Sequence, residues 1–258
     1  VGVMGQFAKS IGVPALAGPF ILAAAAFIIA GLVLLVLLRP DPLAVANAIA
    51  ENQKLNDSNL LNENDKTQIN NKRGIILGAT VMVITQIVMV AIMTMTPVHM
   101  RHHGHGLSDV GMVIGFHVAA MYLPSLVTGV LVDKLGRIFM TIAARATLMA
   151  AGLVAAFAPG DSLLVLIIAL VLLGLGWNFG LISGTALIVD STQPSNRAKT
   201  QGSVDVLVAL AGVSGGGLSG IVVAQTSYTI LSLAGGFLSL LLIPVVVWSR
   251  KKDDDFGN

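Results

Sequence analysis

Long apolar runs separated by short polar connections constrain this chain more than any motif does. An α-helix needs about 20 apolar residues to cross ~30 Å of hydrocarbon at a rise of 1.5 Å per residue. A strand of a membrane barrel is a segment of about 10 residues in which apolar and polar residues alternate, and the runs lack this alternation. The sequence therefore predicts an all-α, polytopic membrane helical bundle with about seven transmembrane helices. The predicted spans are Ala15–Leu38, Gly74–Thr96, Leu107–Val132, Ile138–Ala158, Ser162–Val189, Ser203–Ala224 and Tyr228–Trp248.

The composition is typical of a membrane protein. Hydrophobic residues make up 55% of the chain and charged residues 11%, which is too little polar surface to cover a soluble globule. The net charge is +2 and the basic residues are scattered over short loops, so we expect the lipid bilayer and no nucleic acid as a partner. The chain has no cysteine, which excludes disulfides and thiol chemistry, and we expect no cofactor.

A polar segment divides the chain unequally. Residues 40–73 are rich in Asn, Asp, Glu and Lys, as in a solvated linker. Residues 1–13 resemble the end of a preceding helix followed by a turn, and residues 14–39 form one span before the linker. Residues 74–250 hold six spans, and residues 251–258 form a polar tail. The chain begins with valine and shows no signal-peptide pattern, so we expect a fragment of a longer protein.

Lys and Arg are distributed unequally over the two sets of connections. The set that includes the linker holds most of them, while the opposite set holds Lys9 and Arg101. In membrane proteins the excess of positive charge lies in cytoplasmic loops. A cell-membrane location is therefore predicted, with the linker, the hairpin around Asp133 and the C-terminus cytoplasmic. The first turn and the loop His99–His105 are predicted to be external.

Four histidines in the loop His99–His105 raise the question of a metal site. Imidazoles at this spacing can bind zinc or nickel, but a loop that contains glycine is not preorganised for a metal. Arg101 also opposes a cation electrostatically. We therefore expect a solvated loop and no metal.

A short charged hairpin, Gly129-Val-Leu-Val-Asp133-Lys134-Leu-Gly136-Arg137, joins two of the predicted spans. Gly129 lies four residues before Asp133, on the same helical face, where it would let another helix come close. Gly136 permits a tight turn.

This pattern resembles the signature hairpin of the major facilitator superfamily of secondary transporters, which joins the second and third helices of each six-helix half. Residues 190–202, with Pro194 and Arg197, resemble the loop after the fourth helix of a half. The family usually has a second basic residue where this chain has Ile138. The resemblance implies that the chain is the sixth helix, the central loop and the C-terminal half of a twelve-helix fold, with the N-terminal half missing.

The hairpin charges predict a switch. Asp133 ends its helix against the negative end of the helix dipole, so we expect it to face the positive end of the helix that starts near Ser203. Arg137 can reach Asp190 or free carbonyls. Our hypothesis is a cytoplasmic latch that forms when the protein is open outward and breaks when it opens inward. The alternative is a turn that follows the positive-inside rule and has no switching role.

Two further charges lie within predicted spans. Arg145 and Asp205 are both close to the cytoplasmic ends of their spans, so the cost of burial is moderate. We expect an ion pair or an extension of the latch, with a proton-coupling site at Asp205 as the alternative.

Four polar residues lie near the middle of spans: Gln86, His117, Tyr122 and Asn178. The resemblance implies that the first, second, fourth and fifth helices of a half face the substrate cavity, and these residues lie on the first, second or fourth. They are the predicted cavity residues, and His117 can titrate in the working pH range. The alternative is that they make hydrogen bonds between helices.

The resemblance implies a secondary active transporter of small molecules that works by alternating access. We predict a proton-coupled antiporter for efflux of largely uncharged or amphipathic molecules. The alternatives are a truncated half without independent transport and a receptor-like membrane protein with seven helices. An enzyme is not expected: Gly217-Leu-Ser219-Gly220 resembles the serine motif of rhomboid-like proteases, but no histidine follows Ser219 to activate it.

Overall fold

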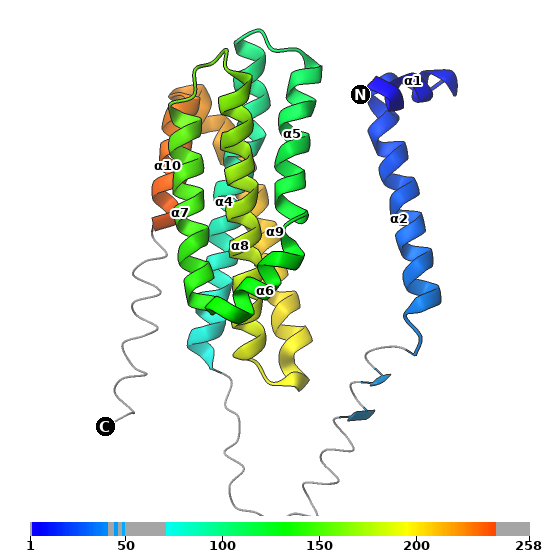
Figure 1. Ribbon diagram of the computed structural model, residues 1–258, viewed down its shortest axis with the longest axis vertical. Helices are drawn as coiled ribbons and strands as arrows, with labels where there is room; N and C mark the ends of the chain where they lie inside the picture. The colour runs from blue at the N-terminus through cyan, green and yellow to red at the C-terminus, as the bar shows by residue number, and fades with distance from the viewer. Residues whose placement is uncertain (1, 41–43, 46–47, 50–70, 241–258) are drawn as a thin grey trace, which may run out of the picture. The chain divides into compact units, whose positions relative to one another are not determined.

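The computed structural model describes residues 2–40, 44–45, 48–49 and 71–240 (Figure 1). The chain divides into two compact units, Val1–Gln68 and Ile69–Asn258, which are described separately below. Every described element is a helix, so the all-α prediction is confirmed for the described residues. Most of the predicted linker, the second part of the last predicted span and the tail 251–258 lie outside the described residues.

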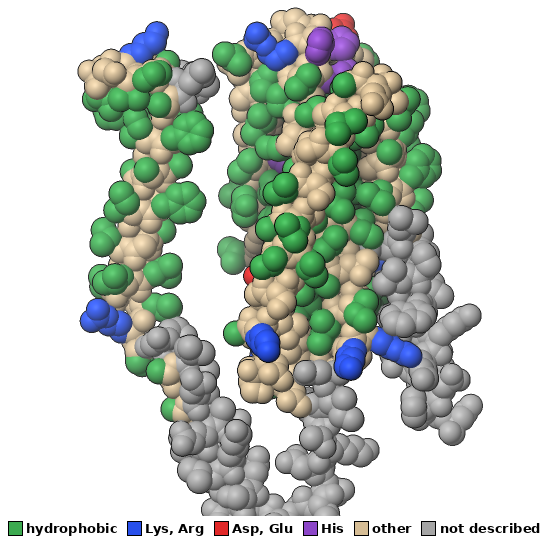
Figure 2. All heavy atoms as spheres, turned by 180° about the vertical axis from the view of Figure 1, so that it is seen from behind, with side chains coloured by type: hydrophobic (Ala, Val, Ile, Leu, Met, Phe, Trp, Pro, Cys, Tyr) green, Lys and Arg blue, Asp and Glu red, His purple; other side chains and the backbone are tan. Residues whose placement is uncertain are grey.

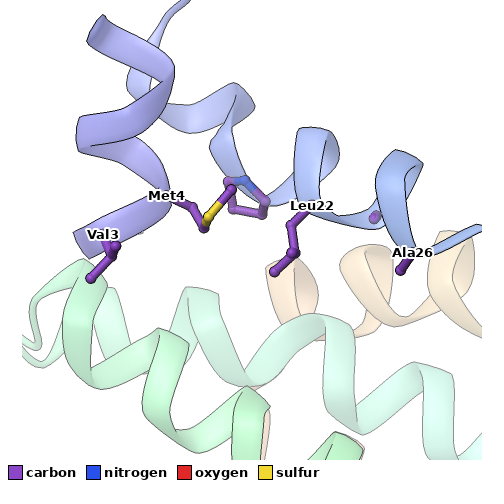
Figure 3. A pocket seen from close by; sticks show the side chains of 6 residues that line it. Val3, Met4, Leu22 and Ala26 are labelled. Atoms are coloured by element: carbon purple, nitrogen blue, oxygen red, sulfur yellow. The ribbon is translucent and has the colours of Figure 1, made fainter. Parts of the chain in front are cut away.

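The first unit is a short helix followed by a long apolar one. α1 spans Gly2–Ser10, a 3-10 turn covers Ala15–Ala17, and α2 spans Gly18–Leu37. Gly18 is buried because the backbone of α1 lies where a side chain would be. The two helices line an open apolar hollow of ≈ 420 Å³ on the surface of this unit (Figure 3), formed by Val3, Met4, Pro19, Leu22, Ala23 and Ala26.

The second unit is a helical bundle. Four of its described helices, α4, α7, α8 and α9, are long and apolar enough to cross a membrane, and α5 with α6 makes a further span. In the first unit, α2 is also long and apolar enough. α10 is apolar and is described as far as Leu240. The bounds in this unit are α4 Lys72–His102, α5 Leu107–Tyr122, α6 Ser125–Leu135, α7 Arg137–Ala156, α8 Leu163–Asp190, α9 Pro194–Gln225 and α10 Tyr228–Leu240.

Three boundaries differ from the prediction. α4 ends at His102 and not at Thr96, so the first half of the predicted loop His99–His105 is helical. The helix predicted to start at Ser203 starts at Pro194, because proline is well suited to the first helical turn and the polar residues that follow continue the helix. The span predicted as Leu107–Val132 is two helices that meet at 41°. Hydropathy marks the part of a helix that lies in hydrocarbon, and it reports neither polar extensions nor bends.

α8 lies at the centre of the bundle. It packs along α4, α5 and α7, while α4 also contacts α9 and α10 (Figure 1). The centre of the core is apolar, with Leu148, Leu166, Leu170 and Leu173 fully buried. Gly78 lets α4 approach α8 closely, since a Cβ there would lie 2.6 Å from the Gly184 carbonyl oxygen.

Charged side chains collect at the two ends of the bundle (Figure 2). We call the end that carries residues 134–137 the hairpin end and the end that carries residues 99–105 the histidine end. Apolar side chains cover the surface between them, as expected for helices in contact with lipid or with another apolar surface.

Candidate functional site

The hairpin is a turn of a single residue. α6 ends at Leu135 and α7 begins at Arg137. Between them Gly136 has φ 91° and ψ 152°, a backbone conformation that is essentially restricted to glycine. Glycine at this position therefore fixes where Arg137 enters α7. Lys134 lies in the last turn of α6 and is exposed to solvent.

Arg137 contacts two carboxylates at the hairpin end. Its Nε lies 2.7 Å from Asp190 Oδ2, and its Nη2 lies 3.4 Å from Asp133 Oδ1. The Nε–H is not aligned with the Asp190 oxygen, so this contact is an ion pair and not a directed hydrogen bond. The Asp133 side chain is 74% exposed, whereas that of Arg137 is 32% exposed. We call Asp133, Arg137 and Asp190 the arginine latch.

The C-terminus of α8 collects donors from two neighbouring segments. Arg197, in the first turn of α9, donates from Nη2 to the Val189 carbonyl at 3.2 Å. Asn71, which caps α4, donates its backbone N–H to the Ser191 carbonyl at 3.0 Å. Both bonds satisfy carbonyls that the end of α8 leaves without helical partners. Arg197 thus acts from a helix and not from the predicted loop.

Two expectations for the hairpin are wrong. No atom of the described residues lies within 4 Å of a Cβ placed on Gly129, so this glycine does not allow a close helix contact there. Asp133 pairs with Arg137 and not with a helix start near Ser203, because Ser203 lies well inside α9. Asp133 is instead held at the surface by a residue of its own hairpin.

The two charges predicted within spans have different surroundings. Arg145 is 4% exposed, and its Nε and Nη2 have no hydrogen-bond partner within the described ranges, so the expected ion pair is not found there. Its backbone carbonyl accepts from Ser239 of α10, so α7 and α10 pack closely at this level. Asp205 is exposed and accepts a 3.0 Å hydrogen bond from Gln201 Nε2, one turn earlier in α9.

Two of the predicted cavity residues meet around a tryptophan. Gln86 Oε1 accepts a 2.8 Å hydrogen bond from Trp177 Nε1. The Trp177 ring contacts the Tyr122 ring edge to face, with centroids 5.8 Å apart. Tyr122 is 60% exposed, whereas Trp177 is 8% exposed. Each residue lies near the middle of its transmembrane segment. We call these three residues the mid-bundle aromatic group.

The other two predicted cavity residues are buried between helices. His117 is fully buried and donates from Nδ1 to the Leu170 carbonyl at 2.8 Å. Asn178 is 1% exposed and makes hydrogen bonds to both α5 and α6. Neither side chain lies on an open face of the described bundle.

Two histidines of residues 99–105 contact other segments, and a third bonds within this stretch. The His99 ring stacks on Tyr228, with centroids 4.3 Å apart and an angle of 18°. His103 Nδ1 donates to the His99 carbonyl at 2.9 Å, and His105 Nε2 donates to the Gly160 carbonyl at 3.0 Å. The described residues contain no group of three His, Cys, Asp or Glu side chains that could hold a metal ion.

Sequence reasoning did not select Trp177, although it is the residue that connects Gln86 with Tyr122. The available signal was its position beside Asn178 in a glycine-rich stretch of an otherwise aliphatic span. Only two tryptophans occur in the chain, so an indole at mid-span was informative.

The sequence matches a known family over nearly its whole length. The model of the Major Facilitator Superfamily matches residues 1–179 and residues 81–256. These two overlapping matches cover both units of the structure.

Two long relatives come from Bacillus subtilis strain 168. The uncharacterized MFS-type transporter YdeG is 69% identical over 97% of this chain, and the chain covers 58% of YdeG. The uncharacterized MFS-type transporter YddS is 66% identical over 96% of the chain, which covers 57% of YddS. The riboflavin transporter RfnT of Brucella anthropi is 29% identical over 69% of the chain, which covers 44% of RfnT. The chain therefore spans less than two thirds of the length of each of these relatives.

Proposed function

Because the chain belongs to the Major Facilitator Superfamily, we propose that it forms the larger part of a secondary active transporter that moves small molecules by alternating access. Membership of a transporter family argues against a receptor-like function. It also indicates that the chain is not an enzyme. The hairpin end is proposed to be cytoplasmic and the histidine end external, on the basis of the distribution of Lys and Arg.

The transport pathway is proposed to run along the face that exposes Tyr122. On the same unit, α9 exposes a row of apolar side chains that includes Leu207, Leu210 and Val213. We propose that the remaining part of a longer transporter, corresponding to its N-terminal half, covers these faces. The relatives, which are longer than this chain, support that arrangement. Without this part, the chain is proposed to lack independent transport.

The mid-bundle aromatic group is the observation that carries the substrate proposal. An exposed phenol ring beside a buried indole offers a surface for stacking a flat ring. The Gln86 amide is already bonded to Trp177 and keeps the indole fixed. No charged side chain belongs to this group, which favours an uncharged or amphipathic ligand. The similarity to a riboflavin transporter supports a planar heterocycle as the ligand class.

Proton coupling is proposed to involve Asp205. This carboxylate is exposed on α9, does not belong to the arginine latch, and has the uncharged Gln201 as its hydrogen-bond partner. His117 is the weaker candidate, since it is enclosed between α5 and α8. Efflux in exchange for protons is the proposed direction.

Fluorescence of Trp177 tests the substrate proposal. The protein would be this chain joined to the part of the YdeG sequence outside their alignment, which we call the joined protein. Trp248→Phe leaves Trp177 as the only tryptophan of this chain, and any tryptophan in the YdeG part is also replaced by phenylalanine, so that Trp177 alone emits. We expect riboflavin to quench its emission saturably, and Tyr122→Leu to weaken the apparent affinity about two- to tenfold, the value of one aromatic contact.

Phe139→Leu is the matched control for this measurement, because Phe139 is 54% exposed on α7 and lies outside the aromatic group. Its apparent affinity for riboflavin should equal that of the parent protein. Equal affinities of Tyr122→Leu and Phe139→Leu would rule out the aromatic group as the ligand site.

A further inference from the structure

The span that leads into the hairpin is broken at one turn. α5 ends at Tyr122, α6 begins at Ser125, and the two helices meet at 41°. Pro124 lies in the break and has no N–H to donate to the preceding turn. A sharp bend at a proline allows one helical segment to rotate against the other.

One amide from α8 bonds to polar groups on both sides of this break. Asn178 Nδ2 donates to the Met121 carbonyl at 2.7 Å and to Ser125 Oγ at 2.9 Å. Asn178 Oδ1 accepts from Thr128 Oγ1 at 2.6 Å. Asn178 is 1% exposed and Thr128 is fully buried. In a continuous helix the Met121 carbonyl would pair with the backbone N–H of Ser125, so the amide replaces a helical bond at the bend.

α5 is held to α8 on the histidine side of the break. His117 Nδ1 donates to the Leu170 carbonyl, and a Cβ on Gly174 would lie 2.6 Å from the His117 carbonyl oxygen. Leu170, Gly174 and Asn178 follow one another at intervals of four residues, so they form one stripe along α8. This stripe fixes α5 by close backbone contact and ends at the bend.

α6 has a more open surface on the hairpin side. Leu126 is 87% exposed and Val127 is 62% exposed. A Cβ on Gly129 would meet no described atom within 4 Å. At the far end of α6, Asp133 joins the arginine latch through a solvent-exposed pair. Thr128 and Val132 are the buried residues of this helix.

We propose that Asn178 is a positioning residue for the transport cycle, which holds the bend between α5 and α6 while α6 swings about Pro124. The swing would carry Asp133 and the start of α7 when the latch opens. The role in transport rests on the proposed function, but the position of α6 depends on Asn178 whatever the substrate is. Its test therefore needs no substrate.

The distance between two spin labels measures the position of α6. The chain has no cysteine, so once any cysteine of the YdeG part is replaced by serine, labels can be placed at Leu135→Cys on α6 and Ile76→Cys on α4, both exposed and both at the hairpin end. Pulsed electron paramagnetic resonance on the joined protein in lipid nanodiscs would compare Asn178→Leu with the parent. α6 is about 16 Å long at 1.5 Å per residue, so a swing of ~15° shifts the distance by about 4 Å.

Thr96→Val is the control, since it also removes a buried hydrogen bond, the one between the Tyr228 hydroxyl and Thr96 Oγ1, but at the histidine end. We expect a shifted or broadened distance in Asn178→Leu and the parent distance in Thr96→Val. If both variants keep the parent distance, the proposal is overturned.

Thr128→Val provides a second variant in case Asn178→Leu does not fold. It removes the bond that Thr128 donates and leaves the bonds of Asn178 to Met121 and Ser125. We expect a smaller shift in the same direction, and an unchanged distance in Thr128→Val would then overturn the proposal. If the joined protein does not bind riboflavin, the substrate proposal is refuted, but the distance measurement still tests the role of Asn178.

Discussion

Replacing Asp190 with asparagine is expected to raise, about 1.5- to fivefold, the rate at which a cysteine at position 132 reacts with a water-soluble maleimide. Val132 is 2% exposed on α6, so Val132→Cys reacts when the hairpin end opens. Asp190 is the closer of the two carboxylates to Arg137, at 2.7 Å. A partly exposed ion pair contributes about 0.2–1 kcal/mol, and the upper value corresponds to a roughly fivefold change in the population of the open state.

Asp133→Asn should raise the same rate less than Asp190→Asn does. Its carboxylate lies 3.4 Å from Arg137 and is 74% exposed, so water screens the pair. Asp109→Asn is the control, because Asp109 lies near His105 at the histidine end. Leu135→Cys, which is exposed in this state, gives the reference rate for free access. A rate in Asp190→Asn equal to that in Asp109→Asn would show that the latch has no influence on opening.

The second large effect is expected at Gly78. A Cβ at this position would lie 2.6 Å from the Gly184 carbonyl oxygen and 2.8 Å from Ile188 Cγ1. A backbone oxygen cannot move away without separating α4 from α8. We expect Gly78→Ala to cost about 1–3 kcal/mol, which lowers the Tm of the purified joined protein by roughly 2–10 °C.

Gly202→Ala is the matched control for Gly78→Ala. Gly202 lies in the polar part of α9, a Cβ there meets no described atom within 4 Å, and both substitutions give a similar gain in helix propensity. The difference in Tm between the two variants therefore reports the clash. Gly78→Ala with the Tm of Gly202→Ala would contradict the close approach of α4 and α8.

The positions of the helices along the chain were predictable because hydrocarbon sets a minimum length for apolar segments. The turn at Gly136 was predictable as well, since few residues adopt its backbone conformation. The start of α9 was not, because residues 194–202 are polar and helical at the same time. Hydropathy reports the environment of a segment, and backbone hydrogen bonds determine where a helix ends.

The faces of the helices were harder to predict than their positions. Gly129 and Gly78 are both glycines in apolar helices, yet only Gly78 lies at a close contact among the described residues. Asn178 and Gln86 are both amides near mid-span, but Asn178 is enclosed and Gln86 is partly exposed. Which side of a helix is covered depends on how it is rotated against its neighbours, and the single sequence does not contain that information.

The break at Pro124 shows the same limit. A proline in an apolar run predicts a bend or an end, but the run is long enough to count as one span. Asn178, which bonds to this break, lies about fifty residues later in the chain, and its three bonds reach both helices. Contacts of this kind depend on tertiary packing and therefore appear only in the structure.

Riboflavin flux into vesicles that contain the joined protein tests proton-coupled efflux most directly. If riboflavin is exchanged for protons, it should accumulate in vesicles whose lumen is more acidic than the bath. Asp205→Asn should abolish this accumulation and retain the quenching of Trp177. Accumulation no faster than in protein-free vesicles, or accumulation only when the bath is the acidic side, would contradict exchange of substrate for protons.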